Sequence, residues 1–246
     1  YTTRDGYHYE SGFYIQRQAE YFYNSRLTYS SQLIGKYKLE QSNIDWALGY
    51  SFANNKMPDR RRINLQENDN ILDPNFGKLQ LDQNDISREF STLNENSYSL
   101  KSNYETNISF GSLTTNFKAG LYGEYRNRDY ANRRFYYRWN YLNLPEDFEY
   151  FDPVSQILIP ENYDANKLYI FEDRDRRNSY QADNILYAGY AAINIPLNRL
   201  NIYTGVRYEY NNMTLHTFTD LEGLRTKDYN IADGKLGRIY PSLNAT

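Results

Sequence analysis

The sequence contains no cysteine and only two histidines among its 246 residues. The missing cysteines exclude a disulfide-stabilised scaffold and thiolate metal sites, and imidazole chemistry has few residues to draw on. No run of about eighteen apolar residues is present, so no segment can cross a bilayer as a helix. The chain is not basic, with a formal net charge of -3 at pH 7, which argues against a nucleic-acid partner.

Tyrosine is abundant where aliphatic residues are scarce. It occurs 28 times, against 12 phenylalanines and 2 tryptophans, and the mean hydropathy is only -0.87. A soluble core of this size normally draws on more leucine, valine and isoleucine. Because tyrosine joins an apolar ring to a hydrated hydroxyl, this composition suits a boundary between lipid and water.

Apolar and polar residues alternate with a period of two along several segments, which is the pattern of β-strands with one apolar and one polar face. In the clearest segment one face carries Ile44, Trp46, Leu48, Tyr50 and Phe52, and the other carries Asp45, Ala47, Gly49, Ser51 and Ala53. The alternating segments are 27–39, 44–53, 98–110, 117–126 and 200–211. Residues 180–195 predict a sixth strand whose faces the pattern does not assign, and a further strand begins near Arg238.

Short and long connections alternate between these strands. Tight turns are predicted near Ser42, Ser112 and Asn198, whereas residues 56–95, 128–179 and 215–237 predict long polar loops. Outer-membrane barrels have short periplasmic turns on one rim and long extracellular loops on the other. The predicted fold is therefore all-β, the wall of an antiparallel transmembrane β-barrel over residues 1–246. The alternative is a soluble sandwich with tyrosine-rich cross-strand pairs.

Aromatic residues fall at both predicted ends of the spanning strands. One set lies near the tight turns and the other toward the long loops, as expected for two interfacial girdles. The sets are Tyr37, Trp46, Phe110 and Phe117 for the turns, and Tyr50, Tyr98, Tyr125 and Tyr208 for the loops.

Four short motifs, in order, resemble the barrel of TonB-dependent outer-membrane receptors, in the style of those from Bacteroidetes and carbohydrate-scavenging proteobacteria. The first is Asp45-Trp46 with Tyr50-Ser51 and Pro58-Asp59-Arg60-Arg61. The others are Asn178-Ser179-Tyr180-Gln181-Ala182-Asp183 with Tyr187-Ala188-Gly189-Tyr190, Gly205-Val206-Arg207-Tyr208-Glu209, and Tyr240-Pro241-Ser242-Leu243-Asn244. Together they cover most of 45–244.

The resemblance implies a barrel of about 22 strands that is filled by an N-terminal plug. It also implies a TonB box that contacts the TonB–ExbB–ExbD motor of the inner membrane. Neither a plug nor a TonB box is found in this sequence, which supplies six strands and the beginning of another. We therefore expect an internal section of a longer integral protein of the Gram-negative outer membrane.

Charged residues on the polar faces are predicted to line the lumen. They are Lys101, Glu105, Lys118, Glu124, Arg126, Arg207 and Glu209. Such residues can contact a plug or a passing ligand. Polar groups of paired sign are also expected in any hydrated lumen, without a specific role.

An aromatic and basic cluster lies in the second predicted loop. The candidate ligand-binding residues are Arg133, Arg134, Tyr136, Tyr137, Trp139 and Tyr141, with Phe135 and Arg138 between them. This composition can stack on sugar rings or bind an anionic chelate, but it also suits a loop that packs on its neighbours.

Metal and catalytic sites are not predicted. Glu172, Asp173 and Asp175 could bind calcium, but they alternate with arginines as a solvated charge run does. His8 and His216 are isolated, and no nucleophile–base set is apparent.

The leading hypothesis is a receptor that imports a scarce solute with energy from TonB, without catalysis and without a cofactor. The solute is a siderophore, haem, cobalamin, an oligosaccharide or a peptide, and a surface lipoprotein is a possible partner. A passive porin-like or structural barrel is the second hypothesis, and a soluble carbohydrate-binding β-sandwich is the third. Sequence upstream of Tyr1 distinguishes the first two, because only the import receptor requires a plug and a TonB box.

Overall fold

The computed structural model describes residues 2–8, 14–81, 86–111, 113–139, 145, 148, 150–164, 166–174, 178–221 and 224–246. The chain divides into two compact units. The first comprises Tyr1–Ser25, Asn55–Thr92 and Ala131–Asn178. The second comprises Arg26–Asn54, Leu93–Tyr130 and Ser179–Thr246.

Strands make up nearly all of the secondary structure in the described residues. They are β1 Thr2–His8, β2 Tyr14–Tyr21, β3 Ser25–Lys38, β4 Ser42–Glu67, β5 Leu79–Leu81, β6 Ser87–Phe110, β7 Leu113–Trp139, β8 Leu168–Asp173, β9 Tyr180–Leu197, β10 Leu200–Leu221 and β11 Leu224–Ala245. One helical turn, α1, spans Val154–Ile157, and a 3-10 turn spans Pro160–Asn162. Among the described residues, neither is long or apolar enough to cross a membrane.

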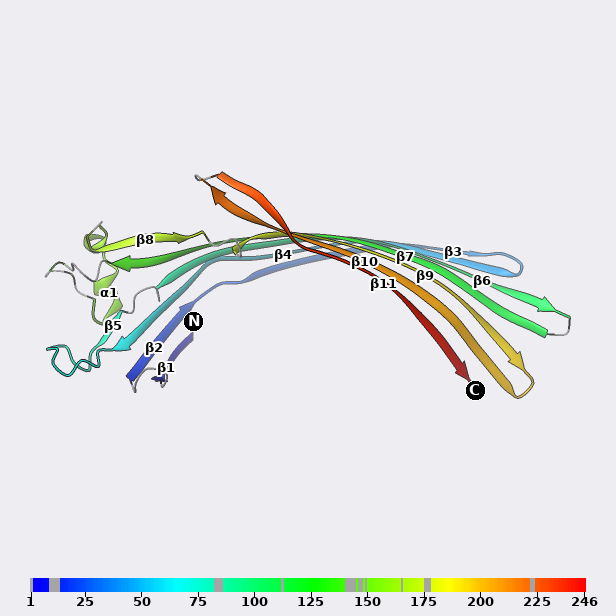
Figure 1. The fold of residues 1–246 in the computed structure, drawn as a ribbon, viewed down its shortest axis with the longest axis horizontal. Helices are drawn as coiled ribbons and strands as arrows, with labels where there is room; N and C mark the ends of the chain where they lie inside the picture. The colour runs from blue at the N-terminus through cyan, green and yellow to red at the C-terminus, as the bar shows by residue number, and fades with distance from the viewer. Residues whose placement is uncertain are drawn as a thin grey trace. The chain divides into compact units, whose positions relative to one another are not determined.

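In the second unit, consecutive strands lie side by side in the order β3, β4, β6, β7, β9, β10 and β11 (Figure 1). The pairs β7–β9, β9–β10 and β10–β11 are antiparallel over most of their length. These are the six strands and the beginning of a seventh that the sequence predicts. The all-β, antiparallel fold class is therefore confirmed.

Tight turns close the hairpins of this unit where they are predicted. The N–H of Leu39 donates to the carbonyl of Ser42 at 2.8 Å between β3 and β4. Gly111 has a φ of 62° after β6, and Asn198 has a φ of 48° after β9. Glycine adopts a positive φ without steric cost, and asparagine tolerates it. Pro196, predicted as part of the last turn, instead pairs with Asn201 inside the hairpin.

The register places the predicted apolar positions of neighbouring strands on one face. Leu121 of β7 pairs with Gly189 of β9, which pairs with Tyr208 of β10. One residue along each strand, Tyr122 pairs with Ala188, and Ala188 pairs with Glu209. Because directly paired residues share a face, β9 continues both faces, which its own sequence does not assign.

Four tyrosines form a row across β3, β4, β6 and β7. The ring centroids of Tyr29 and Tyr50 lie 6.2 Å apart, those of Tyr50 and Tyr98 5.2 Å, and those of Tyr98 and Tyr125 6.4 Å. The Tyr50 hydroxyl donates to the side-chain oxygen of Asn96 at 3.0 Å. Three predicted girdle residues thus lie in one continuous row, which Tyr29 extends.

At Gly35, the absence of a side chain lets Trp46 of β4 lie over β3. A β-carbon at Gly35 would overlap the indole ring, so we expect Gly35→Ala to displace it and to cost about 1–3 kcal/mol. The emission of Trp46 in a Trp139→Phe background measures the displacement. Gly123→Ala is the matched control, because its β-carbon would meet only Tyr187, at 3.9 Å. Identical emission from both variants would contradict this packing.

The long loops predicted at 56–95, 128–179 and 215–237 are largely wrong. β4 continues to Glu67, β6 begins at Ser87, β7 continues to Trp139, and β10 and β11 reach Leu221 and Leu224. These extensions are rich in charged and amide side chains, and apolar residues such as Ile63, Leu65 and Tyr137 are confined to short stretches of them. A hydrophobic period of two is therefore missing, and without it a polar strand resembles a loop in the sequence.

The first unit has a small apolar core on these extensions. β4 pairs with β2 and with β5, and β7 pairs with β8. Residues that precede α1 cover the strands: the Phe148 ring lies 6.4 Å from that of Trp139. The core comprises Leu65, Leu81, Ile86, Tyr137, Trp139, Phe148, Ile157 and Leu168.

Candidate functional site

The polar face of the second unit carries most of the predicted lumen charges as ion pairs. The ammonium of Lys118 lies 3.3 Å from the carboxylate of Glu105. The register places Glu209, Glu124 and Arg126 on the same face of β7 and β10 as Lys118. Arg126 contacts Glu124 at 2.8 Å and Arg207 contacts Glu209 at 2.6 Å, while Lys101 is exposed. A lumen role for this face remains a prediction.

A further carboxylate on this face, Glu95, was not predicted as a site residue. It accepts a hydrogen bond from the Arg128 Nε at 2.6 Å and lies 3.8 Å from the Arg126 guanidinium. Both Glu95 and Arg128 fell at the ends of predicted loops, so their cross-strand pairing could not be inferred. The polar face is thus a series of alternating charges rather than a surface of one sign.

The aromatic and basic cluster lies on strand β7 and not in a loop. Alternation divides it between the two strand faces. Tyr137 and Trp139 are 7% and 5% exposed and belong to the core, so neither lies on an exposed loop surface. Tyr141 lies outside the described residues. The location predicted for the cluster is therefore wrong, and the structure does not unite its members in one site.

The remaining members of the cluster have defined partners. Arg133 donates to Glu172 at 2.7 Å and stacks over Phe135 at 4.9 Å. Arg138 lies 4.0 Å from the Phe171 ring centroid. These contacts join β7 to β8, so part of this chemistry holds the first unit together.

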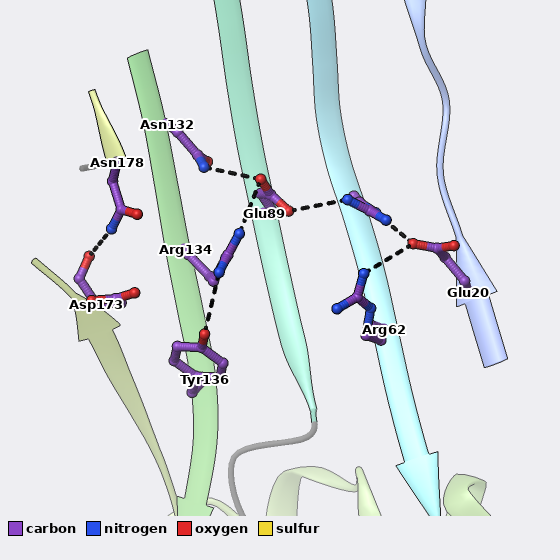
Figure 2. A network of polar contacts seen from close by, with 9 residues as sticks. Glu20, Arg62, Glu89, Asn132, Arg134, Tyr136, Asp173 and Asn178 are labelled. Atoms are coloured by element: carbon purple, nitrogen blue, oxygen red, sulfur yellow. Dashed lines mark hydrogen bonds and ion pairs between the residues drawn. The ribbon is translucent and has the colours of Figure 1, made fainter. Parts of the chain in front are cut away.

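Glu89 is the centre of a polar network across four strands, which Figure 2 shows. Its side chain, only 11% exposed, lies 3.5 Å from Arg134 and 3.6 Å from Arg60. The Asn132 amide donates to it at 2.9 Å. Arg60 also donates to Glu20 of β2 at 2.5 Å. No pattern in the sequence indicates this network, because its residues lie on polar strands far apart in the chain.

The structure describes two of the three possible calcium ligands, Glu172 and Asp173. Glu172 pairs with Arg133, and Asp175 lies outside the described residues. No cluster of three or more histidine or acidic side chains occurs in the described part of the chain. His216 lies on β10, paired with Gln181, and the side chain of His8 is outside the described set.

Asp59 links two arginines in the first unit. The Nε and Nη2 of Arg88 donate to the two carboxylate oxygens of Asp59, each at 2.9 Å. The Arg61 Nε donates to the same carboxylate at 2.8 Å. The hydrogen bonds from Arg88 hold the pKa of Asp59 below its ordinary value of 3.8, and those from Arg61 add to this.

This lowered pKa predicts a pH dependence of stability. Because the folded pKa is below the unfolded one, the contribution of Asp59 is complete above pH 3.8 and is lost as the pH falls through the folded pKa. Wild type should therefore resist heat denaturation better than Asp59→Asn at about pH 6, and the difference should shrink as the pH falls below 3.8. A difference that persists at the lowest pH would contradict this role.

Comparison with known proteins adds one distant likeness. No protein-family model and no curated protein matches the chain. Among solved structures, it is similar to the siderophore receptor PiuA from Acinetobacter baumannii, with 9% sequence identity and a TM-score of 0.38. The likeness covers 99% of this chain but only 41% of that one, so the chain spans less than half of the receptor's length. Such a low similarity assigns neither a substrate nor a partner.

Proposed function

We propose that the second unit is a section of an outer-membrane β-barrel whose apolar face contacts lipid. The supporting observation is the exposure of that face: Leu121 is 69% exposed, Leu100 51% and Val206 47%. Contiguous apolar surface of this kind marks a contact with a membrane or with protein. The row of tyrosines across four strands matches the interfacial girdle of such barrels.

The length of the apolar alternation supports the same proposal. A spanning strand needs about 9–11 residues, and the alternation on β4 covers only Ile44 to Phe52, although the strand continues to Glu67. The residues beyond Phe52, including Asp59 and Arg60, therefore lie outside the lipid in this proposal. They form part of the extracellular rim.

We propose further that the complete protein is a receptor that imports a scarce solute, a siderophore or metal complex or an oligosaccharide, with energy from TonB. The four receptor-like motifs and the paired charges of the polar face support this. TonB–ExbB–ExbD would act through a plug domain. The polar face and the rim would meet the solute, and no catalytic step is part of the proposal.

A passive or structural barrel is the second candidate, since a hydrated lumen with paired charges also suits a pore. A soluble sandwich is less well supported. It requires a second sheet over residues such as Leu48 and Leu100, and the described strands form one sheet that leaves both side chains exposed.

Uptake by cells that carry the complete gene tests the import proposal. Import that requires both TonB and the proton gradient supports it, whereas uptake that persists without TonB indicates a passive pore. Candidate solutes are supplied as ferric siderophores and as oligosaccharides, and accumulation of each is compared with cells that lack the gene.

A further inference from the structure

A pocket in the first unit combines an apolar floor with three arginines, Arg61, Arg62 and Arg88. It has a volume of about 190 Å³. Its lining includes Arg61 and Ile63 of β4, Ile86 beside β6, and Tyr163 after the 3-10 turn. Open ligand sites for drug-sized molecules measure roughly 300–1,000 Å³, so this pocket fits a small molecule or one group of a larger one.

The charge at the pocket is positive. Arg88 of β6 also lines it, and the two guanidiniums of Arg61 and Arg88 share the single carboxylate of Asp59. Each guanidinium has five N–H donors, and Asp59 binds only part of them. The side chain of Arg61 is 57% exposed, so donors remain accessible at the rim of the pocket.

The same imbalance extends over the surrounding network. Glu20 is shared by Arg60 and Arg62, and Glu89 by Arg60 and Arg134. Together with Asp59, three carboxylates therefore serve five arginines. Arg60 and Glu89 alternate with Arg61 and Arg88 along β4 and β6, so they lie on the opposite face of these strands. The positive charge at the pocket itself comes from Arg61, Arg62 and Arg88, and it favours an anion there.

Aromatic rings form one side of the pocket. The rings of Tyr137 and Tyr163 meet edge to face at 6.0 Å. Burial raises the pKa of the Tyr163 hydroxyl, and Tyr137 adds to this, so the hydroxyl stays protonated and can donate. Rings and isoleucines suit a planar apolar body, while the arginines suit a carboxylate.

We propose that this pocket binds a small carboxylate with an aromatic or other planar apolar body. The carboxylate contacts Arg61 and Arg88, and the apolar body lies against Ile63, Ile86 and the tyrosine rings. This goes beyond the proposed import function, because it assigns a ligand chemistry to a pocket that shares only Tyr137 with the predicted cluster.

Benzoate binding to the complete protein, purified in detergent, tests this inference by calorimetry or saturation-transfer NMR. We expect saturable binding of benzoate. Benzamide lacks the charge and acetate lacks the ring, so each should bind about tenfold more weakly. Absence of benzoate binding, or equal binding of benzamide or acetate, would overturn the proposal.

Two variants locate the site. Arg61→Gln should weaken benzoate binding about tenfold. Because the side chain of Arg61 is exposed, we expect this variant to fold. Asp59→Asn should strengthen binding, because it removes the competing carboxylate. The matched control is Arg17→Gln, an exposed arginine of the same unit that pairs with Asp152 at 3.5 Å. Equal losses in Arg61→Gln and Arg17→Gln would overturn the assignment.

The measurement in detergent needs neither TonB nor transport. Failure of benzoate binding would therefore leave the import proposal intact. Conversely, TonB-independent uptake would contradict the import proposal without contradicting benzoate binding at the pocket.

Discussion

Replacing Leu121 with arginine is expected to remove most of the folded protein from the outer membrane. Leu121 lies on the apolar face of β7, midway between Phe117 and Tyr125, where the proposed lipid contact is deepest. An arginine at the midplane of a barrel wall costs roughly 2–4 kcal/mol. That penalty is a large part of the stability of a typical protein. Heat-modifiable migration of the outer-membrane fraction in gels measures the folded amount.

The control is Tyr122→Arg, one residue along the same strand and on the opposite face. The Tyr122 hydroxyl donates to Glu124 at 2.6 Å, and an arginine there can pair with the same carboxylate in a hydrated environment. We expect near-normal folded protein from this variant. If both variants accumulate equally, Leu121 does not face lipid, and the membrane proposal fails with it.

The arrangement of the second unit was predictable because strands with one apolar and one polar face have a strict period of two. A shift of one residue would turn Leu48, Leu121 and Val206 to the polar side, so the sequence specifies the faces. The tight turns also have local signals, glycine at 111 and asparagine at 198. The two faces of β9 could not be assigned from the sequence, because Ala188 and Ala192 make its polar face apolar too.

The strands of the first unit were not predictable from the sequence, because their many polar residues obscure the alternation of apolar and polar positions. Segments such as Lys56–Glu67 are mostly polar, although Leu65 belongs to the core and Ile63 packs against it, and their strands pair with β2 and β5. The core also depends on Phe148 and Ile157, distant residues without periodicity that pack on the strands.

The candidate site was likewise predictable only in part. Lys118 and Glu105 were assigned correctly to one face, because apolar neighbours on β6 and β7 fix their orientation. In the cluster on β7, alternation alone would have separated Arg134 and Tyr136 from Tyr137 and Trp139, once a strand was recognised there. The pairing of Glu89 with Arg60 had no sequence signal, because register between polar strands is weakly specified.

Replacing Glu89 with alanine is expected to destabilise the first unit by about 1–3 kcal/mol. Removal of this carboxylate deprives Arg134 and Arg60 of a shared partner and leaves the Asn132 amide without its acceptor. The loss of one partner from a fully buried pair costs roughly 3–5 kcal/mol. We expect less, because both arginines are about one third exposed and Arg60 keeps Glu20. Guanidinium denaturation in detergent, followed by protease resistance of the polar strands, measures the change.

The matched control is Glu172→Ala, which breaks the pair with Arg133. Arg133 is largely exposed, and pairs of that kind contribute about 0–1 kcal/mol. A double variant adds a stricter test: Arg134→Ala should restore part of the stability lost in Glu89→Ala, because it removes the uncompensated charge. Equal costs for Glu89→Ala and Glu172→Ala, with no rescue by the double variant, would show that Glu89 is not the centre of the network. Neither the burial of the Glu89 charge nor the number of its contacts would then add measurably to the stability of this unit.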